Sequence, residues 1–456
     1  MTFLNILNNR RLSSQEQGFE LLNRYSGTWV VVLVSRIKGP LSEDIVRQAL
    51  DLVQRRHPRL HSRIVGLKGN LCFESEGTQK IPLRLVDKEV PWQEVVLEEL
   101  NNKIESRQGL MRAVLVRSDK HNVGHLITTI HHVIIDGLSG IRLHQEILTY
   151  MHKIASGVQI SQVPGLSALP PVDALLPDSM KKGFKGAIKG LLFFGRLLFK
   201  TVWYRPKTLE LEACVPLELR RCGMVHLELE VALTQQLVNT CKQKKTTVQA
   251  ALCAAMLFVA AKKIRLTTVR VSCNSVVDLR KRLDFSPHPG PLSNGERARV
   301  SDENLGVLAS GLMTFHILRT NTSFWALARE VKQQLKMGLE RDDIFITTLM
   351  FRRIAKLLLA RPDKGSGLVT VTNVGKVNIP KSYGPYELES ISFAPSMAAF
   401  GGSFMAAVTT FDGKMLINWT FSEPALSRET MEVMANEVVG CLAEVCQRED
   451  IYFGQG

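Results

Sequence analysis

The sequence contains no long hydrophobic segment. No window holds the eighteen or more consecutive apolar residues that are needed to span a bilayer. The N-terminal segment MTFLNILNNRRLSSQEQ also lacks the apolar core and the small-residue cleavage site of a secretory signal. We therefore expect a cytoplasmic protein.

Paired cysteines are also missing. None of the eight cysteines forms a C-x-x-C pair, the spacing that is typical of zinc ligands and redox-active dithiols. Several lie in apolar stretches, such as Cys253 in AALCAAMLFVAA. This pattern indicates reduced thiols in the core and excludes a disulfide framework as the basis of the fold.

Acidic residues are fewer than basic residues. The chain has 58 lysines and arginines against 43 aspartates and glutamates, which gives a formal net charge of +15. Such an excess favours an acidic partner, for example a nucleotide-bearing cofactor, an acidic carrier protein or anionic lipid. We do not expect nucleic acid, because the sequence has no helix-turn-helix, zinc-finger or RNP motif.

The elements that are present form two halves with a similar order. At 45% apolar and 22% charged residues, the chain is an ordinary globular protein of two or three domains. Each half mixes helices with a largely antiparallel sheet, and a hairpin is predicted to turn at Asp412-Gly413. The expected fold class is α/β, with two α+β two-layer sandwiches. We assign an N-terminal lobe at 1–160, a connecting segment at 161–215 and a C-terminal lobe at 216–456.

The connecting segment is unusually basic. After a proline-rich stretch it continues as KKGFKGAIKGLLFFGRLLFKTVWYRPK, which carries eight basic residues and no acidic one. A helix with this pattern is typical of a segment that lies in an anionic membrane interface, at the inner face of the membrane for a cytoplasmic protein. The alternative is a linker helix whose apolar face packs on the protein and whose basic edge is solvated. Six of the basic residues fall within about 100° of arc on such a helix. We expect these six to contact lipid headgroups: Lys181, Lys182, Lys185, Lys189, Arg196 and Lys200.

A second irregular stretch separates two strand-like segments at about 282–304. Long loops of this kind are functional or disordered. We expect an inserted flexible loop, in which His288 has no role.

Two histidines stand side by side in GHLITTIHHVIIDGLSG. Successive side chains of a strand point to opposite faces, so His131 and His132 cannot serve one site in the same way. Asp136 alone is a poor complement to them as a metal ligand, and no cluster of glutamates or cysteines lies nearby. We therefore predict no metal site, and a pair of structural histidines is the plain alternative to a catalytic one.

The segment His131 to Gly137, HHVIIDG, resembles the HHxxxDG signature of acyltransferases that share the chloramphenicol acetyltransferase fold. That superfamily includes condensation domains of nonribosomal peptide synthetases, wax ester synthase/diacylglycerol acyltransferases, polyketide-associated acyltransferases and alcohol acetyltransferases. The resemblance covers nearly the whole chain and includes VVDLRKRL, ENLGVLASG and VTNVGKV in the second half. The N-terminal stretch is most similar to polyketide-associated and stand-alone condensation-type enzymes. The resemblance implies two lobes with an active-site channel between them.

Acyl transfer needs a base near neutral pH to take the proton of the attacking group, and imidazole suits that role. The resemblance makes His132 this base and His131 a buried structural residue. No serine or cysteine elbow stands near the motif, so we expect direct attack through a ternary complex without an acyl-enzyme. No cofactor is expected to be bound permanently, because acyl-CoA or the acyl-phosphopantetheine of a carrier protein would be the substrate.

The resemblance gives Asp136 a structural role as the partner of an arginine in the second lobe. Arg280 in VVDLRKRL is the matching candidate, and a catalytic carboxylate is the alternative. Gly137 would let the chain turn into a helix beginning near Leu138. Asn373 in TNVG either lines the channel or makes a structural turn.

These observations predict an acyltransferase that moves an acyl group from a thioester to a hydroxyl of a lipid or polyketide-like acceptor. The basic segment favours a hydrophobic acceptor. An amine would make the same demand on His132, so a condensation-type enzyme that forms an amide is an alternative. A second alternative is a catalytically silent member of the fold that docks carrier proteins or membranes.

Overall fold

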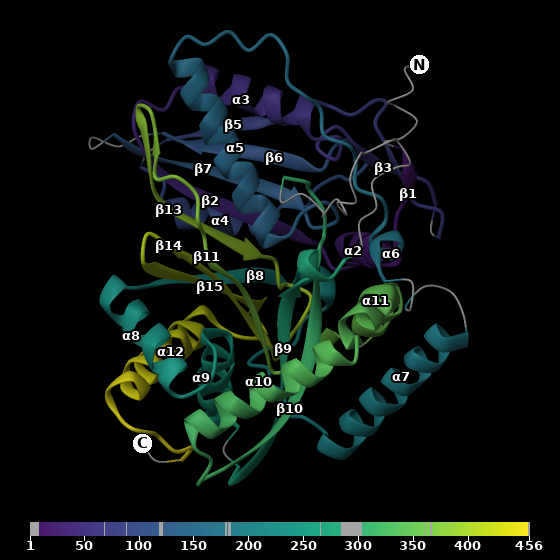
Figure 1. The fold of residues 1–456 in the computed structure, drawn as a ribbon, viewed down its shortest axis with the longest axis vertical. Helices are drawn as coiled ribbons and strands as arrows, with labels where there is room; N and C mark the ends of the chain where they lie inside the picture. The colour runs from purple at the N-terminus through teal and green to yellow at the C-terminus, as the bar shows by residue number, and fades with distance from the viewer. Residues whose placement is uncertain are drawn as a thin grey trace, which may run out of the picture.

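The computed structural model describes residues 9–67, 69–87, 89–117, 122–177, 180, 184–264, 266–283, 303–360, 362–364 and 367–454, and of residues 184–187 only the backbone. Residues 284–302 of the predicted loop, with His288, lie outside the described residues. Two lobes are stacked on each other, each built on a six-stranded sheet (Figure 1). The chain therefore has the two-lobed mixed α/β fold that the sequence predicts.

The first lobe is built on a sheet with the strand order β12-β13-β2-β7-β6-β5. All neighbours in it are antiparallel except β5 and β6. Its strands are β2 (Val30–Lys38), β5 (Leu83–Val86), β6 (Met111–Val116), β7 (Val123–His131), β12 (Ser382–Tyr383) and β13 (Tyr386–Pro395). A separate small sheet is formed by β1 (Arg10–Arg11), β4 (Cys72–Glu74) and β3 (Arg63–Val65).

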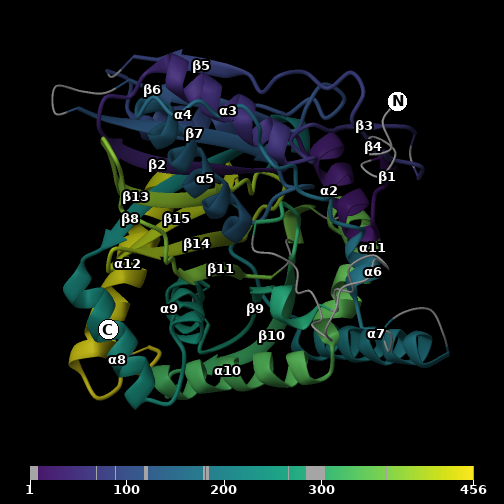
Figure 2. The same cartoon turned by 45° about the horizontal axis from the view of Figure 1, so that its top comes forward.

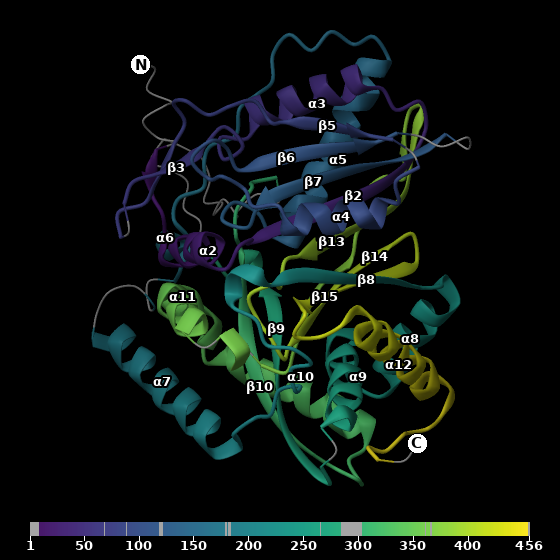
Figure 3. The same ribbon diagram turned by 180° about the vertical axis from the view of Figure 1, so that it is seen from behind.

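Helices cover both faces of this sheet. On one face, α3 (Glu43–Arg56) and α5 (Gly137–Ala155) form a core with Leu33 and Ile37 of β2. On the other face, α4 (Trp92–Asn101) packs against Val32 and Val34 (Figure 3). Burial on both sides explains why β2 reads as a continuous apolar run without the alternation of a half-exposed strand.

The second lobe is built on a sheet with the order β10-β9-β11-β14-β15-β8, in which β11 runs parallel to both of its neighbours. The predicted hairpin joins β14 to β15, and its turn residues Asp412 and Gly413 have φ angles of 47° and 81°. Both angles lie in the left-handed region that this tight turn requires. The strands are β8 (Arg221–Leu229), β9 (Thr268–Asp278), β10 (Ala309–Arg319), β11 (Val369–Lys376), β14 (Phe404–Phe411) and β15 (Lys414–Glu423).

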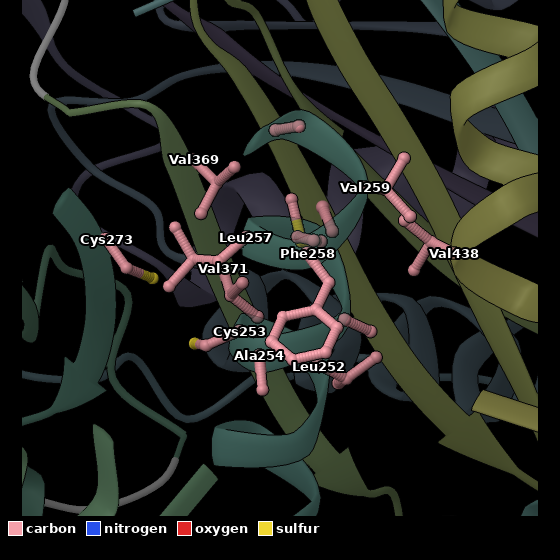
Figure 4. Close-up of a cluster of buried hydrophobic side chains, with 14 of the residues drawn as sticks. Leu252, Cys253, Ala254, Leu257, Phe258, Val259, Cys273, Val369, Val371 and Val438 are labelled. Atoms are coloured by element: carbon pink, nitrogen blue, oxygen red, sulfur yellow. The ribbon is translucent and has the colours of Figure 1, made fainter. Parts of the chain in front are cut away.

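The core of the second lobe surrounds one helix, α9 (Val248–Lys263), whose residues 250–261 are all buried. Figure 4 shows Cys253 of this helix near Cys273 of β9, beside Val371 of β11. The hydrogen bond that the Cys273 thiol donates to Cys253, together with burial, raises the pKa of Cys273 well above its usual value. All eight cysteines are free, and four of them are buried, whereas Cys214 is exposed. Around α9 lie α8 (Val231–Gln243), α10 (Phe324–Glu340) and α12 (Arg428–Gln447).

The chain crosses between the lobes at β12 and β13. These strands fall within the predicted C-terminal lobe 216–456, yet β13 pairs with β2 of the first sheet (Figures 1 and 2). A boundary drawn along the sequence therefore does not separate the two sheets. A second link is α11 (Asp343–Ala360), which packs along α2 (Ser14–Tyr25).

The connecting segment contains α6 (Val172–Leu175) and α7 (Phe184–Tyr204), and the short η2 (Leu217–Leu219) follows it. Helix α7 lies along the outside of the second lobe, next to α11 and β10 (Figures 1 and 3). Within the described ranges, no helix is long and apolar enough to cross a bilayer. The remaining elements are two 3-10 turns, η3 (Arg280–Arg282) and η4 (Pro362–Lys364).

Candidate active site

His132 lies immediately after the end of β7, at the start of the loop that leads into α5. Its backbone N–H donates to the carbonyl of Trp29, which anchors the loop to the start of β2. Its imidazole stacks on the ring of Phe19, with 4.6 Å between ring centroids, and lies near the ring of Trp29 at 6.2 Å. The imidazole therefore has a fixed plane and forms part of the wall of a pocket between the lobes.

The hydrogen bonds of His132 select one tautomer. Its Nδ1 lies 2.7 Å from the carbonyl oxygen of Ile135, so this nitrogen carries a proton and donates it. No described residue bonds to Nε2, which is left to accept a proton. Burial lowers the pKa of His132 below its usual value, and this outweighs the opposing effects of the Ile135 carbonyl and the Asp136 charge. The ring is therefore neutral at neutral pH, the form that a general base needs.

His131 is fully buried and points away from this pocket. Its Nδ1 accepts the backbone N–H of Val133 at 3.0 Å, so its Nε2 carries the proton that is donated to Glu20 at 2.8 Å. Glu20 also accepts from Ser106 and Arg24. Although burial favours the protonated acid, these donors and His131 lower the pKa of Glu20 to about 2. His131 thus ties the motif to α2 through a partner that the sequence analysis did not identify.

The side chain of Asp136 accepts hydrogen bonds from donors of both lobes. It is the N-cap of α5 and accepts the backbone N–H of Ser139 at 2.9 Å. Its other oxygen accepts the backbone N–H of Leu308, from the segment that leads into β10. Arg280 completes the set at 3.1 Å, and both side chains of the pair are about 95% buried. Burial alone would raise the pKa of Asp136, but the Arg280 charge and the backbone donors hold it below its usual value.

This geometry makes Asp136 a bridge between the lobes. Arg280 and Leu308 belong to the second lobe, whereas Asp136 opens the first-lobe helix that follows the histidines. The carboxylate contributes nothing to the lining of the pocket. Asp136 thus contacts the second lobe and not the pocket, and the structural role that the resemblance implies stays a prediction.

The surroundings of Gly137 and Asn373 add detail to the expectations for both residues. Helix α5 begins at Gly137, as predicted within one residue, whereas Gly137 does not have a left-handed backbone. A Cβ atom there would lie 2.8 Å from the ring of Phe393, so the glycine is required by close packing against β13. Asn373 accepts the backbone N–H of Gly375 at 2.8 Å and lies outside the pocket lining, which is the structural-turn alternative.

The pocket next to His132 has a volume of about 350 Å³. Its wall combines Phe19 and Trp29 of the first lobe with side chains of β9, β10, α11 and α7, most of them apolar. Three buried polar atoms in this wall lack a hydrogen-bond partner in the described part of the chain: Gln15 Oε1, Trp29 Nε1 and Ser310 Oγ. The sequence analysis identified none of these residues, because no local pattern marks them as neighbours of His132.

The basic face of α7 turns toward the protein, against expectation. Lys189 pairs with Asp342 at 3.0 Å, Arg196 pairs with Asp343 at 3.3 Å, and Lys200 lies over the ring of Phe315. These three side chains therefore do not lie on the outer face that a membrane would meet. The linker alternative predicted that the apolar face packs on the protein and that the basic edge is solvated. The structure shows the opposite, because the apolar side chains of α7 are exposed. Lys181, Lys182 and the side chain of Lys185 lie outside the described residues.

The orientation of α7 has a simple electrostatic cause. Asp342 and Asp343 stand at the junction of α10 and α11 and provide negative charge where α7 packs. The sequence of residues 181–207 alone does not predict these partners, because they lie about 150 residues downstream.

Comparisons of sequence match parts of the chain to one family and to two relatives. Residues 219–294 match the family described as phthiocerol/phthiodiolone dimycocerosyl transferase C-terminus. The probable alcohol acetyltransferase FCK4 of Fusarium pseudograminearum is 23% identical over 329 residues, which are 68% of this chain and 65% of that protein. The chondramide synthase cmdD of Chondromyces crocatus is 33% identical over 129 residues, which are 25% of this chain and 3% of that protein. The chain thus spans less than two thirds of either relative.

Comparisons of structure cover nearly the whole chain. The polyketide synthase associated protein 5 of Mycobacterium tuberculosis superposes with a TM-score of 0.69 and 17% identity, over 96% of this chain and 98% of that one. The TRI3 trichothecene 15-O-acetyltransferase of Fusarium sporotrichioides gives 0.73 and 12% identity, over 95% of each chain. The first condensation domain of the CDA synthetase gives 0.68 and 15%, over 98% and 99%. The chain therefore shares the fold of these acyltransferases and condensation domains over nearly its whole length.

Proposed function

We propose that the protein is an acyltransferase that moves an acyl group from a thioester to a hydroxyl of a lipid or polyketide-like acceptor. The observation that carries this proposal is the neutral His132, with its tautomer fixed and its ring in the wall of an apolar pocket between the lobes. The relatives support acyl transfer in general, since they include an alcohol acetyltransferase and a trichothecene acetyltransferase. The donor is acyl-CoA or an acyl carrier protein.

In the proposed reaction, the acceptor hydroxyl donates its proton to His132 Nε2 while its oxygen attacks the thioester carbonyl carbon. The tetrahedral intermediate then collapses with cleavage of the carbon–sulfur bond. The imidazolium returns the proton to the departing thiolate, so the products are an ester and a free thiol. His132 ends the cycle neutral, as it began, and a base of this kind contributes about 10²- to 10⁴-fold to the rate.

An acyl-enzyme is not needed in this scheme. Within the described residues the pocket lining contains no cysteine, and its serine, Ser310, is hydrogen-bonded to no histidine. A serine without an adjacent base is a weak nucleophile. We therefore assign Ser310 to binding and not to covalent catalysis.

The oxyanion of the intermediate requires hydrogen-bond donors. The unpartnered Trp29 Nε1–H and Ser310 hydroxyl are the donors that we propose, because each is buried in the same pocket wall as His132. Trp29 also stacks near the His132 ring, which places one donor beside the base. Donors that are already buried and oriented stabilise a developing charge more strongly than water does.

The test is thiol release from a panel of acyl-CoAs, short to long, with lipid alcohols as acceptors and mass spectrometry of the products. The proposal expects release that requires both the acceptor and His132. His61→Ala is the matched control for His132→Ala, because His61 is an exposed histidine of the same lobe. If the wild-type protein releases thiol neither from acyl-CoAs nor from loaded carrier proteins, the enzyme proposal is wrong and the silent docking alternative replaces it.

Amide formation is a second candidate, because condensation domains of peptide synthetases share the fold over almost the full length. An amine that attacks the thioester would lose its proton to the same Nε2. Amino acceptors therefore belong in the panel. Products with the mass of an amide, in the absence of any ester, would replace the hydroxyl acceptor by an amine.

A further inference from the structure

The outer face of α7 is apolar, and no described residue covers it. Seven of the eighteen large apolar side chains that are exposed in the described residues belong to this one helix. Trp203 stacks on Phe199, with 5.8 Å between ring centroids, at the C-terminal end of this face. The strongly exposed members, 57–75% accessible, are Leu191, Leu192, Leu198, Phe199, Val202 and Trp203.

A helix on the surface of a globular protein normally buries its apolar face and exposes its charges. Helix α7 does the reverse, because Lys189 and Arg196 are paired with Asp342 and Asp343 on the protein side. A contiguous apolar patch of this kind marks a contact site and not a solvated surface. The ion pairs on the inner side fix which face remains for that contact.

The inner face of α7 borders the pocket of the proposed active site. Phe193, Phe194 and Leu197 of α7 line the same pocket as His132. Across from them, Leu357 and Leu358 of α11 also line it, and Leu357 is 66% exposed. The pocket is thus lined by His132 and by side chains of both α7 and α11, of which Leu357 reaches the surface.

The charges around α7 select the kind of surface that it meets. Residues 179–209 contain no acidic side chain. Exposed Arg205 and Lys207 follow the helix, and exposed Arg353 and Lys356 lie on the neighbouring α11. An apolar face accompanied by cations suits a bilayer with anionic headgroups, whose interior takes the apolar side chains while its surface attracts the lysines and arginines.

We propose that the outer face of α7 inserts into an anionic bilayer, and that a lipid acceptor enters the pocket from this bilayer between α7 and α11. The second half of this proposal rests on the proposed function, whereas the docking itself does not. Helix α7 then has a membrane side and a substrate side, and the lipid passes beside it without crossing water.

Docking is tested by sedimentation of the full chain with vesicles of phosphatidylcholine and phosphatidylglycerol, and with vesicles of phosphatidylcholine alone. The triple variant Leu198→Gln, Phe199→Gln, Trp203→Gln removes apolar surface from the outer face. We expect its partition onto the anionic vesicles to fall at least about 100-fold, because three large side chains lose their burial in lipid. The matched control changes three exposed apolar residues elsewhere, Leu219→Gln, Val231→Gln and Val433→Gln, and should bind as the wild type does.

Equal binding of the triple variant and the wild type would overturn the docking. Absence of vesicle binding by the wild type would overturn it too. If sedimentation velocity then showed a dimer that the triple variant abolishes, the face would belong to a second copy of the chain.

The entry route is tested by the ratio of the transfer rates for a bilayer-resident long-chain alcohol and a water-soluble short-chain alcohol. The triple variant should lower this ratio roughly in proportion to its lost vesicle binding, whereas the control triple should preserve it. A ratio that stays constant although binding is lost would refute the route. Vesicle binding without transfer of any acyl group would instead refute the proposed function and leave the docking intact.

Discussion

The loop that carries the two histidines and the helix α7 are both held by ion pairs between segments far apart in the sequence, yet their surroundings differ. The Asp136–Arg280 pair is 5% and 4% exposed and lies among backbone donors. The Lys189–Asp342 pair is 33–38% exposed on both sides. Loss of Arg280 leaves the buried Asp136 carboxylate without its cation, whereas loss of one partner in the second pair leaves a charge that water solvates. The geometry around His132 is therefore fixed firmly, and α7 is attached weakly.

The sharpest test of this contrast is Asp136→Ala. The change leaves the buried Arg280 with only the partly exposed Asp278 as its carboxylate partner, at 2.8 Å, and removes the N-cap of α5, so we expect a loss of about 3 kcal/mol in the free energy of unfolding. Denaturant titration measures the loss, and transfer activity should fall with it. Asp136→Asn is the informative companion, because it retains an N-cap acceptor and removes only the charge. A fully stable but inactive Asp136→Ala variant would contradict the positioning role.

Next in size is the effect of His132→Ala on turnover. The proposed loss of general-base catalysis predicts a decrease of about 100-fold or more in kcat, with a protein that remains folded. Steady-state thiol release measures the rate, and circular dichroism checks the fold. Near-normal turnover would refute the base assignment. In contrast to Asp136→Ala, this substitution should change the rate much more than the stability.

A pH titration examines the buried contacts of the same loop. The pKa of Glu20 is about 2 in the folded chain, against an ordinary 4.5. Because the folded value is depressed, Glu20 contributes stability that is fully present above the ordinary pKa. That contribution should be lost as the pH falls from about 4.5 toward 2. Glu20→Gln should flatten the dependence of unfolding free energy on pH in this window, and an unchanged slope would mean that other acids control it.

The smallest expected effect completes the comparison. Lys189→Met removes one partner of a half-exposed pair and should change the unfolding free energy by less than about 1 kcal/mol. The measurement is the same denaturant titration that is used for Asp136→Ala. A loss as large as that of Asp136→Ala would show that α7 is as firmly fixed as the histidine loop, and the contrast between the two regions would disappear.

Local sequence signals predicted the parts of the fold that depend on neighbouring residues. The Asp412-Gly413 turn, the helix after HHVIIDG and the continuous strand at Val30 each follow from backbone preference or burial over a short stretch. Arg280 was found through the resemblance, and the structure places it 3.1 Å from Asp136. The first three features are readable because their causes lie within short stretches, whereas Arg280, 144 residues from Asp136, was found only through the resemblance.

The features that sequence reasoning missed depend on partners far away in the chain. Glu20 meets His131 across 111 residues, and Asp343 meets Arg196 across 147. No periodicity in either segment encodes such a partner. The direction in which α7 faces was therefore predicted wrongly for its described lysines and arginine, although its helical character and basic composition were read correctly.

The crossover of β13 has a consequence for synthesis of the chain. While the ribosome is still making the second half, the edge of β2 that will receive β13 has unpaired N–H and C=O groups. That edge stays open until residues 386–395 have emerged. A nascent or truncated first lobe therefore exposes a strand that can pair with other chains, and it is a natural client for chaperones until its last strand arrives.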